Sequence, residues 1–170
     1  GGIETDLTVI CIEENHFRII SAAATRTHDK AHILKHLSPK LELNDITDEL
    51  VCLGIFGPKS RSLISKISKD NFSNDTLNFG RGKYTQIGSR KVWVQRLSYV
   101  GELGFEIYIN NIDAKEIYQL IIEEGKNHKL SHCGSHAMDV MRMESGFLHW
   151  GHDISPEENQ YEAGLDFAIS

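Results

Sequence analysis

The chain has 170 residues, of which 40% are apolar and 25% are charged, and its formal net charge is −6. These proportions are typical of a globular protein that buries a core, and one domain is the simplest expectation. The negative charge argues against a surface that binds nucleic acid or an anionic membrane. No apolar run is long enough to span a bilayer, and no signal-peptide pattern opens the chain.

The three cysteines, Cys11, Cys52 and Cys133, are widely spaced and form no CxxC pair. Because their neighbours are apolar or mixed, we expect buried free thiols rather than disulfides. Free thiols indicate a reducing compartment, which predicts a cytoplasmic protein or, as the alternative, one of the mitochondrial matrix. The chain begins at Gly1-Gly2 without a methionine, which indicates a fragment or a cloning remnant.

Hydrophobic periodicity predicts a mixture of strands and helices along the chain. The expected strands are residues 7–12, 17–20, 50–56, 83–87, 92–97 and 105–109, and the expected helices are 25–37, a helix opened by Pro58, 112–124 and 135–144. The first two strands form a hairpin, and the last three form an antiparallel meander. Residues 70–82 are polar and predict a loop. Strands grouped together, with helices between them, indicate an α+β fold with antiparallel sheets and packed helices.

The strand at 105–109 is the most informative stretch. Its residues alternate, so Phe105, Ile107 and Ile109 share one face while Glu106 and Tyr108 share the other. A carboxylate among apolar neighbours needs a partner or water. The pattern alone is compatible with a Glu106 that faces solvent or a lysine of a neighbouring strand.

Histidine-rich segments suggest metal sites, but their spacing does not support one. His32 and His36 lie four residues apart on a predicted helix, without the glutamate of a metalloprotease motif. A second group, comprising His132, Cys133, His136, His149 and His152, matches no compact zinc-ligand pattern. We therefore expect no metal.

Other chemical motifs are equally weak. Gly80-Arg81-Gly82 lacks the length and the Lys-Ser/Thr ending of a phosphate loop. The sequence contains no Gly-x-Ser-x-Gly elbow of a hydrolase. The residues alone leave two notable carboxylates, Asp6 and Glu106, with no assigned chemistry.

Several blocks, in the same order along the chain, resemble the folate-binding aminomethyltransferase family, which includes the glycine-cleavage T-protein and the C-terminal regions of dimethylglycine and sarcosine dehydrogenases. The first is Gly1-Gly-Ile-Glu-Thr-Asp-Leu7, and another is Tyr99-Val-Gly-Glu-Leu-Gly-Phe-Glu106. The remaining blocks are Gly54–Arg61, the Arg-Met-Glu-Ser-Gly stretch within 137–154, and Glu162-Ala-Gly-Leu165. Together the blocks cover essentially the whole chain.

Variant residues resemble the dehydrogenase-fused folate domains more than the T-protein. His149-Trp-Gly-His152 stands where T-proteins tend to have Leu-Tyr-Gly. Met138 replaces an arginine of the T-proteins, and Ser21 replaces an asparagine near the folate. The resemblance implies the central part of the T-protein-like fold. Residues 1–170 would then be an incomplete folate-binding domain, lacking an N-terminal pocket segment and a C-terminal β domain.

The resemblance also implies site residues. Asp6 matches the family's catalytic aspartate, and Glu106 matches the carboxylate that binds the pterin ring. Further implied contacts to folate are Tyr99, Ile19, Ile20, Ser21 and Trp150. The implied cofactor is tetrahydrofolate, with FAD only in an upstream dehydrogenase module.

The implied reaction moves a one-carbon unit from an amine donor to tetrahydrofolate and forms methylenetetrahydrofolate. The donor would be a small amine or a lipoylated carrier protein. Two alternatives stay open, namely a non-catalytic folate-binding regulatory relative and a folate-dependent demethylase with another methyl donor.

Overall fold

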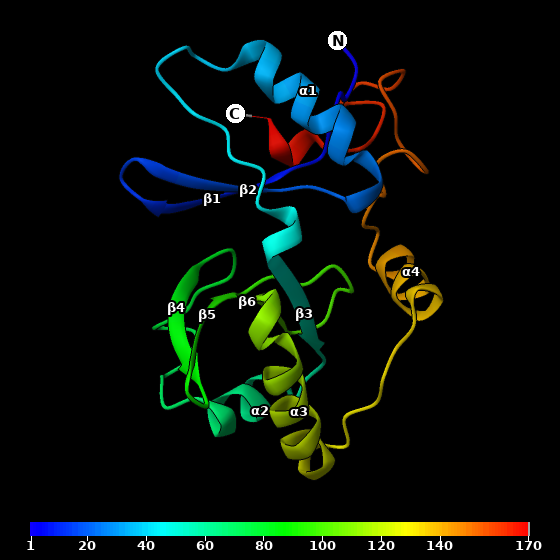
Figure 1. Cartoon of the computed structure of the whole chain (residues 1–170). Coiled ribbons are helices and arrows are strands. Elements are labelled where there is room, and N and C mark those ends of the chain that lie inside the picture. Colours follow the sequence, from blue (N-terminus) through cyan, green and yellow to red (C-terminus); the bar gives the residue numbers. More distant parts are fainter. Residues whose placement is uncertain (170) are drawn as a thin grey trace. The chain divides into compact units, whose positions relative to one another are not determined.

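The computed structural model describes residues 1–169, and the chain divides into two compact units (Figure 1). Unit 1 consists of residues 1–44 together with the end of the chain from Leu148. Unit 2 is the continuous stretch Asp45–Phe147. The two units differ in charge, since unit 1 has 11 acidic and 5 basic residues whereas unit 2 has 13 of each.

Unit 1 contains the predicted hairpin, formed by β1 (Thr8–Glu13) and β2 (His16–Ile20). The two strands pair antiparallel, with Val9 opposite Ile19 and Cys11 opposite Phe17. A short 3-10 turn follows at Ala23–Thr25 and leads into helix α1 (Arg26–His36). Another 3-10 turn lies at Asp166–Ala168.

Helix α1 departs from its predicted packing. The sequence predicts an apolar stripe of Ile33, Leu34 and Leu37, yet Leu34 is 51% exposed. The one fully buried residue of the helix is Asp29. Thr25 stands at the N-cap position, but its hydroxyl donates to the Ala22 carbonyl and to Asp29 rather than capping the helix. The residue by which α1 is buried is therefore Asp29 and not Leu34.

Unit 2 is built on a four-stranded antiparallel sheet in the order β3-β6-β5-β4. The strands are β3 (Leu50–Phe56), β4 (Gly82–Ile87), β5 (Arg90–Gln95) and β6 (Gly104–Asn110). The predicted meander of the last three strands is confirmed, and β3 joins it by pairing along the whole of β6. The helices of unit 2 are α2 (Ser60–Ile67), α3 (Ala114–Gly125) and α4 (Ser135–Glu144). These observations confirm the α+β fold.

The core of unit 2 lies between one face of the sheet and the helices α2 and α3 (Figure 1). Phe105, Ile107 and Ile109 of β6 are at most 1% exposed and pack there. Full burial of such a side chain contributes about 1.5–3 kcal/mol each. Phe72 and Leu77 anchor the predicted loop between α2 and β4 in the same core. Because side chains alternate along β6, Glu106 and Tyr108 lie on the opposite face, as predicted.

The expectation of buried cysteines is wrong. Cys11, Cys52 and Cys133 are all exposed free thiols. Cys11 lies opposite the exposed Phe17 in the hairpin, and Cys52 lies opposite Tyr108, on the sheet face away from the helices. Cys133 lies in the segment just before α4. The apolar sequence neighbours of Cys11 and Cys52 did not indicate burial, because neighbouring residues in a strand point to opposite faces.

Within the part of the chain that the structure describes, no helix is long and apolar enough to cross a membrane.

Candidate functional site

Glu106 lies on the face of the unit 2 sheet that is opposite the core formed with α2 and α3. Its neighbours across the ladder are Gly54 on β3 and Gln95 on β5. The hydroxyl of Tyr108 donates a hydrogen bond of 2.5 Å to Oε2 of Glu106. Within residues 1–169, no other hydrogen bond to this carboxylate is formed. Glu106 therefore holds one oxygen in place and keeps the other available.

Tyr108 remains a donor over the whole physiological pH range. Burial is the main cause that raises the pKa of its phenol well above the ordinary value, and nearby Cys52 and Glu106 raise it further. Removing a proton would place a second negative charge beside the carboxylate in a poorly solvated position. The phenol therefore fixes the direction of the Glu106 carboxylate.

The raised pKa of Tyr108 predicts that the protein loses stability at high pH. The phenol ionises near pH 10 in the unfolded chain but stays protonated in the fold, so its contribution to stability is complete below pH 10 and is lost as pH rises above it. Between pH 10 and 11, this one group removes about 1 kcal/mol from the free energy of unfolding. Tyr108→Phe should lose less stability than the wild type over this interval, measured by urea unfolding. Equal losses would contradict the protected phenol.

Beside Glu106, a pair of buried polar side chains forms a rigid part of the same face. Trp93 Nε1 donates to Gln95 Oε1 at 2.9 Å, and Gln95 Nε2 donates to the Gly80 carbonyl at 2.9 Å. A Cβ at Gly82 would fall 2.2 Å from Gln95 Oε1 and 2.5 Å from the Trp93 ring. Glycine at the start of β4 is therefore required for this arrangement. Because these hydrogen bonds satisfy their polar atoms, Trp93 and Gln95 form a rigid surface next to the Glu106 carboxylate.

The loop before β6, which carries Tyr99, is held against the end of α4. Tyr99 stacks on Phe147, with ring centroids 6.3 Å apart and planes 16° from parallel. Ser145 Oγ donates to the Val100 carbonyl at 3.4 Å. Gly101 has a φ of +72°, and a Cβ there would lie 1.9 Å from Ser145 Oγ. The glycine of the turn thus permits both the backbone conformation and the close approach of α4.

The other predicted site residues lie in unit 1. Asp6 lies two residues before β1, is exposed, and makes no hydrogen bond or ion pair within residues 1–169. Ile19 on β2 is 38% exposed. Ser21 follows β2, and its hydroxyl bonds to the Asp29 carboxylate. Trp150 donates from Nε1 to the Ile3 carbonyl at 2.7 Å and stacks on His28 at 5.3 Å.

The histidine groups considered from the sequence form ring pairs instead of clusters. The His32 and His36 rings lie 4.7 Å apart, and the His149 and His152 rings lie 5.0 Å apart. Across residues 1–169, no group of three or more histidine, cysteine, aspartate or glutamate side chains is placed to hold a metal.

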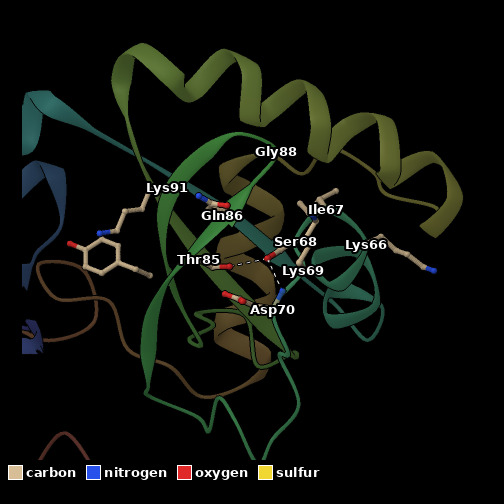
Figure 2. A pocket seen from close by; sticks show the side chains of 10 residues that line it. Lys66, Ile67, Ser68, Lys69, Asp70, Thr85, Gln86, Gly88 and Lys91 are labelled. Atoms are coloured by element: carbon tan, nitrogen blue, oxygen red, sulfur yellow. Dashed lines mark hydrogen bonds between the residues drawn. The ribbon is translucent and has the colours of Figure 1, made fainter.

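A separate pocket of about 570 Å³ opens between the end of α2 and the edge strand β4. Figure 2 shows Lys66 and Lys91 on opposite sides of Ser68 and Thr85. The hydroxyl oxygens of Ser68 and Thr85 lie 2.8 Å apart. None of the predicted site residues lines this pocket.

Sequence reasoning missed the partners of the site residues. Alternation places Tyr108 beside Glu106, so the Tyr108 contact had a signal in the strand pattern. The Trp93–Gln95 pair depends on the register of β5 against β6, and the Asp29 cluster depends on residues far apart in sequence. Neither has a local signature.

Comparison with known proteins identifies the relatives of this arrangement. The family model described as "GCVT N-terminal domain" matches residues 1–170. The chain belongs to this family. The solved structure of the glycine cleavage system aminomethyltransferase T from Bartonella henselae has a TM-score of 0.82 and 25% identity, over 99% of this chain and 44% of that one. The predicted resemblance and the T-protein fold are confirmed.

Two curated relatives of this GCVT N-terminal domain are much longer proteins, an oxidase and a dehydrogenase. The 4-methylaminobutanoate oxidase (formaldehyde-forming) of Paenarthrobacter nicotinovorans is 35% identical over 100% of this chain and 21% of its own length. The mitochondrial dimethylglycine dehydrogenase of Rattus norvegicus is 31% identical over 99% of this chain and 20% of its own length. The chain thus spans about a fifth of the length of these relatives.

Proposed function

We propose that this chain is the folate-binding part of a one-carbon transferase that forms methylenetetrahydrofolate from an amine donor. Membership of the GCVT N-terminal domain family supports folate-dependent one-carbon transfer as the class of reaction. The observation that carries the proposal is the Glu106 carboxylate, held by Tyr108 on a stiff strand with an oxygen left available. It supports the pterin-binding role that the sequence resemblance implies.

The chemistry of the pterin ring suits this carboxylate. The ring presents an N–H and an adjacent amino group as a planar pair of donors. A carboxylate accepts such a pair through two charge-assisted hydrogen bonds, which provide both affinity and orientation. An ionised carboxylate has about four acceptor positions, so Oε2 can accept from Tyr108 and from the ligand together.

Asp6 is proposed to act on the one-carbon unit. Its carboxylate is exposed and has no partner within residues 1–169, so it is free to meet a substrate. A carboxylate near the reactive amine of tetrahydrofolate can accept a proton or stabilise a cationic one-carbon carrier. Tyr99, Ile19, Ser21 and Trp150 are proposed as further folate contacts on the basis of the family resemblance.

The donor and the setting are proposed from the relatives. Since both curated relatives are named for oxidation of methylated amines, a small methylated amine is the favoured donor. A lipoylated carrier protein is the alternative, by resemblance to the T-protein. We propose that residues 1–170 belong to a larger folate-binding domain and that FAD is present only with an upstream dehydrogenase module. The compartment is proposed to be the cytoplasm or the mitochondrial matrix.

Calorimetry on the complete protein tests this function. Tetrahydrofolate is expected to bind with a stoichiometry of about one per chain, since each Glu106 carboxylate binds one pterin ring. Zinc is expected to produce no binding heat beyond dilution. Zinc binding without tetrahydrofolate binding would contradict the proposal.

A further inference from the structure

The Asp29 carboxylate accepts hydrogen bonds from hydroxyl groups of two segments of unit 1, the residues before β1 and the connection between β2 and α1. The side chain is 2% exposed. Thr5 Oγ1 donates to Oδ1 at 2.6 Å, and Thr25 Oγ1 donates to Oδ2 at 2.5 Å. The Ser21 hydroxyl also bonds to this carboxylate, and His28 Nδ1 lies 3.2 Å from Oδ1. A buried charge with this many donors is fully satisfied.

These hydrogen bonds keep Asp29 ionised. Burial by itself opposes ionisation, but the donors from Thr25, Thr5, His28 and Ser21 outweigh it and lower the pKa of the carboxyl. An ionised carboxylate is an acceptor only, so it accepts from every hydroxyl that faces it.

Thr5 immediately precedes Asp6, and the residues before it are fastened as well. Ile3 accepts from Trp150 Nε1 at 2.7 Å and donates from its amide to the Glu158 carbonyl at 2.9 Å. Glu4 Oε1 lies 3.1 Å from His28 Nε2. The backbone leading to Asp6 is thus held at consecutive residues, while the Asp6 carboxylate itself is exposed and unpaired within residues 1–169.

We propose that Asp29 is a positioning residue, which holds the segment of residues 3–5 through Thr5 so that the Asp6 carboxylate is presented in a fixed orientation. This inference rests on the proposed function of Asp6. A displacement of about 1 Å of a catalytic group costs on the order of 10²-fold in rate. A buried carboxylate that binds donors from both segments restrains such a displacement. A role limited to stabilising the start of α1 would require the Thr25 contact but not the Thr5 contact.

The test uses the complete protein and removes single hydroxyls. Thr5→Val keeps the branched shape but deletes the donor, so kcat for one-carbon transfer should fall about 10–100-fold while KM for tetrahydrofolate changes less than about threefold. Thr5→Ser restores the hydroxyl and should recover most of kcat. Thr27→Val, a matched change on the exposed side of α1, should leave both constants unchanged. Asp29→Asn should resemble Thr5→Val or be more severe.

Amide hydrogen exchange gives a readout that is independent of turnover. Thr5→Val should raise exchange in residues 3–8 and leave α1 protected, whereas a purely structural role predicts unchanged kcat and no local change. Normal turnover and exchange in Thr5→Val would overturn the positioning role and leave the proposed function intact. A wild-type protein without one-carbon transfer would instead overturn the proposed function, and with it the catalytic meaning of the Asp29 contact.

Discussion

Replacing Asp6 with asparagine is expected to slow one-carbon transfer by about 10²–10⁴-fold, the usual loss when a well-placed general base or charge stabiliser is removed. The amide is neutral and far less basic, so it neither accepts the proton nor stabilises a cationic carrier. Tetrahydrofolate affinity should change much less, because the Glu106 carboxylate is untouched. The measurement is the rate of methylenetetrahydrofolate formation by the complete protein with its amine donor.

Glu14→Gln is the matched control for Asp6→Asn. Glu14 is an exposed carboxylate in the β1–β2 turn of the same unit, and the substitution makes the same chemical change. Its rate should equal that of the wild type. A wild-type rate for Asp6→Asn as well would reduce Asp6 to a structural residue and favour the non-catalytic folate-binding alternative. Complete loss of folate binding in Asp6→Asn would place Asp6 in the anchor instead.

The features predicted correctly are those that depend on local periodicity. The two-residue period of 105–109 assigned Phe105 to the core and Glu106 to the other face, and the structure confirms both. The helical period assigned Ser135–Glu144 with its observed bounds. Such patterns succeed because the side chains of one face share one environment.

The features missed depend on contacts between distant segments. The pairing of β3 with β6 joins residues 48 to 60 positions apart, and no local pattern specifies which strand β3 pairs with. The sequence does not indicate that Asp29 is buried, because Ile33 and Leu34 give the helix an amphipathic pattern. The hydrogen-bond partners of Asp29 include Thr5, 24 residues away. Polar networks of this kind become visible only in three dimensions.

Replacing Glu106 with glutamine is expected to weaken tetrahydrofolate binding by about 1.5–3 kcal/mol, the typical contribution of hydrogen bonds to a charged group. This corresponds to a factor of about 10–150 in Kd. Tyr108 requires an acceptor on one side and the pterin requires acceptors on the other. The amide has only one acceptor atom, so one of these donors must face an NH2 group. The fold should persist, because the glutamine side chain has the same size.

A set of calorimetric titrations tests whether the Glu106 carboxylate binds the pterin. Tetrahydrofolate is titrated into the complete wild-type protein, into Glu106→Gln and into Glu102→Gln, which alters an exposed glutamate in the turn before β6. We expect Kd to rise by a factor of about 10–150 for Glu106→Gln and to stay at the wild-type value for Glu102→Gln. Equal affinities in the two variants would contradict the assignment of Glu106 as the pterin anchor.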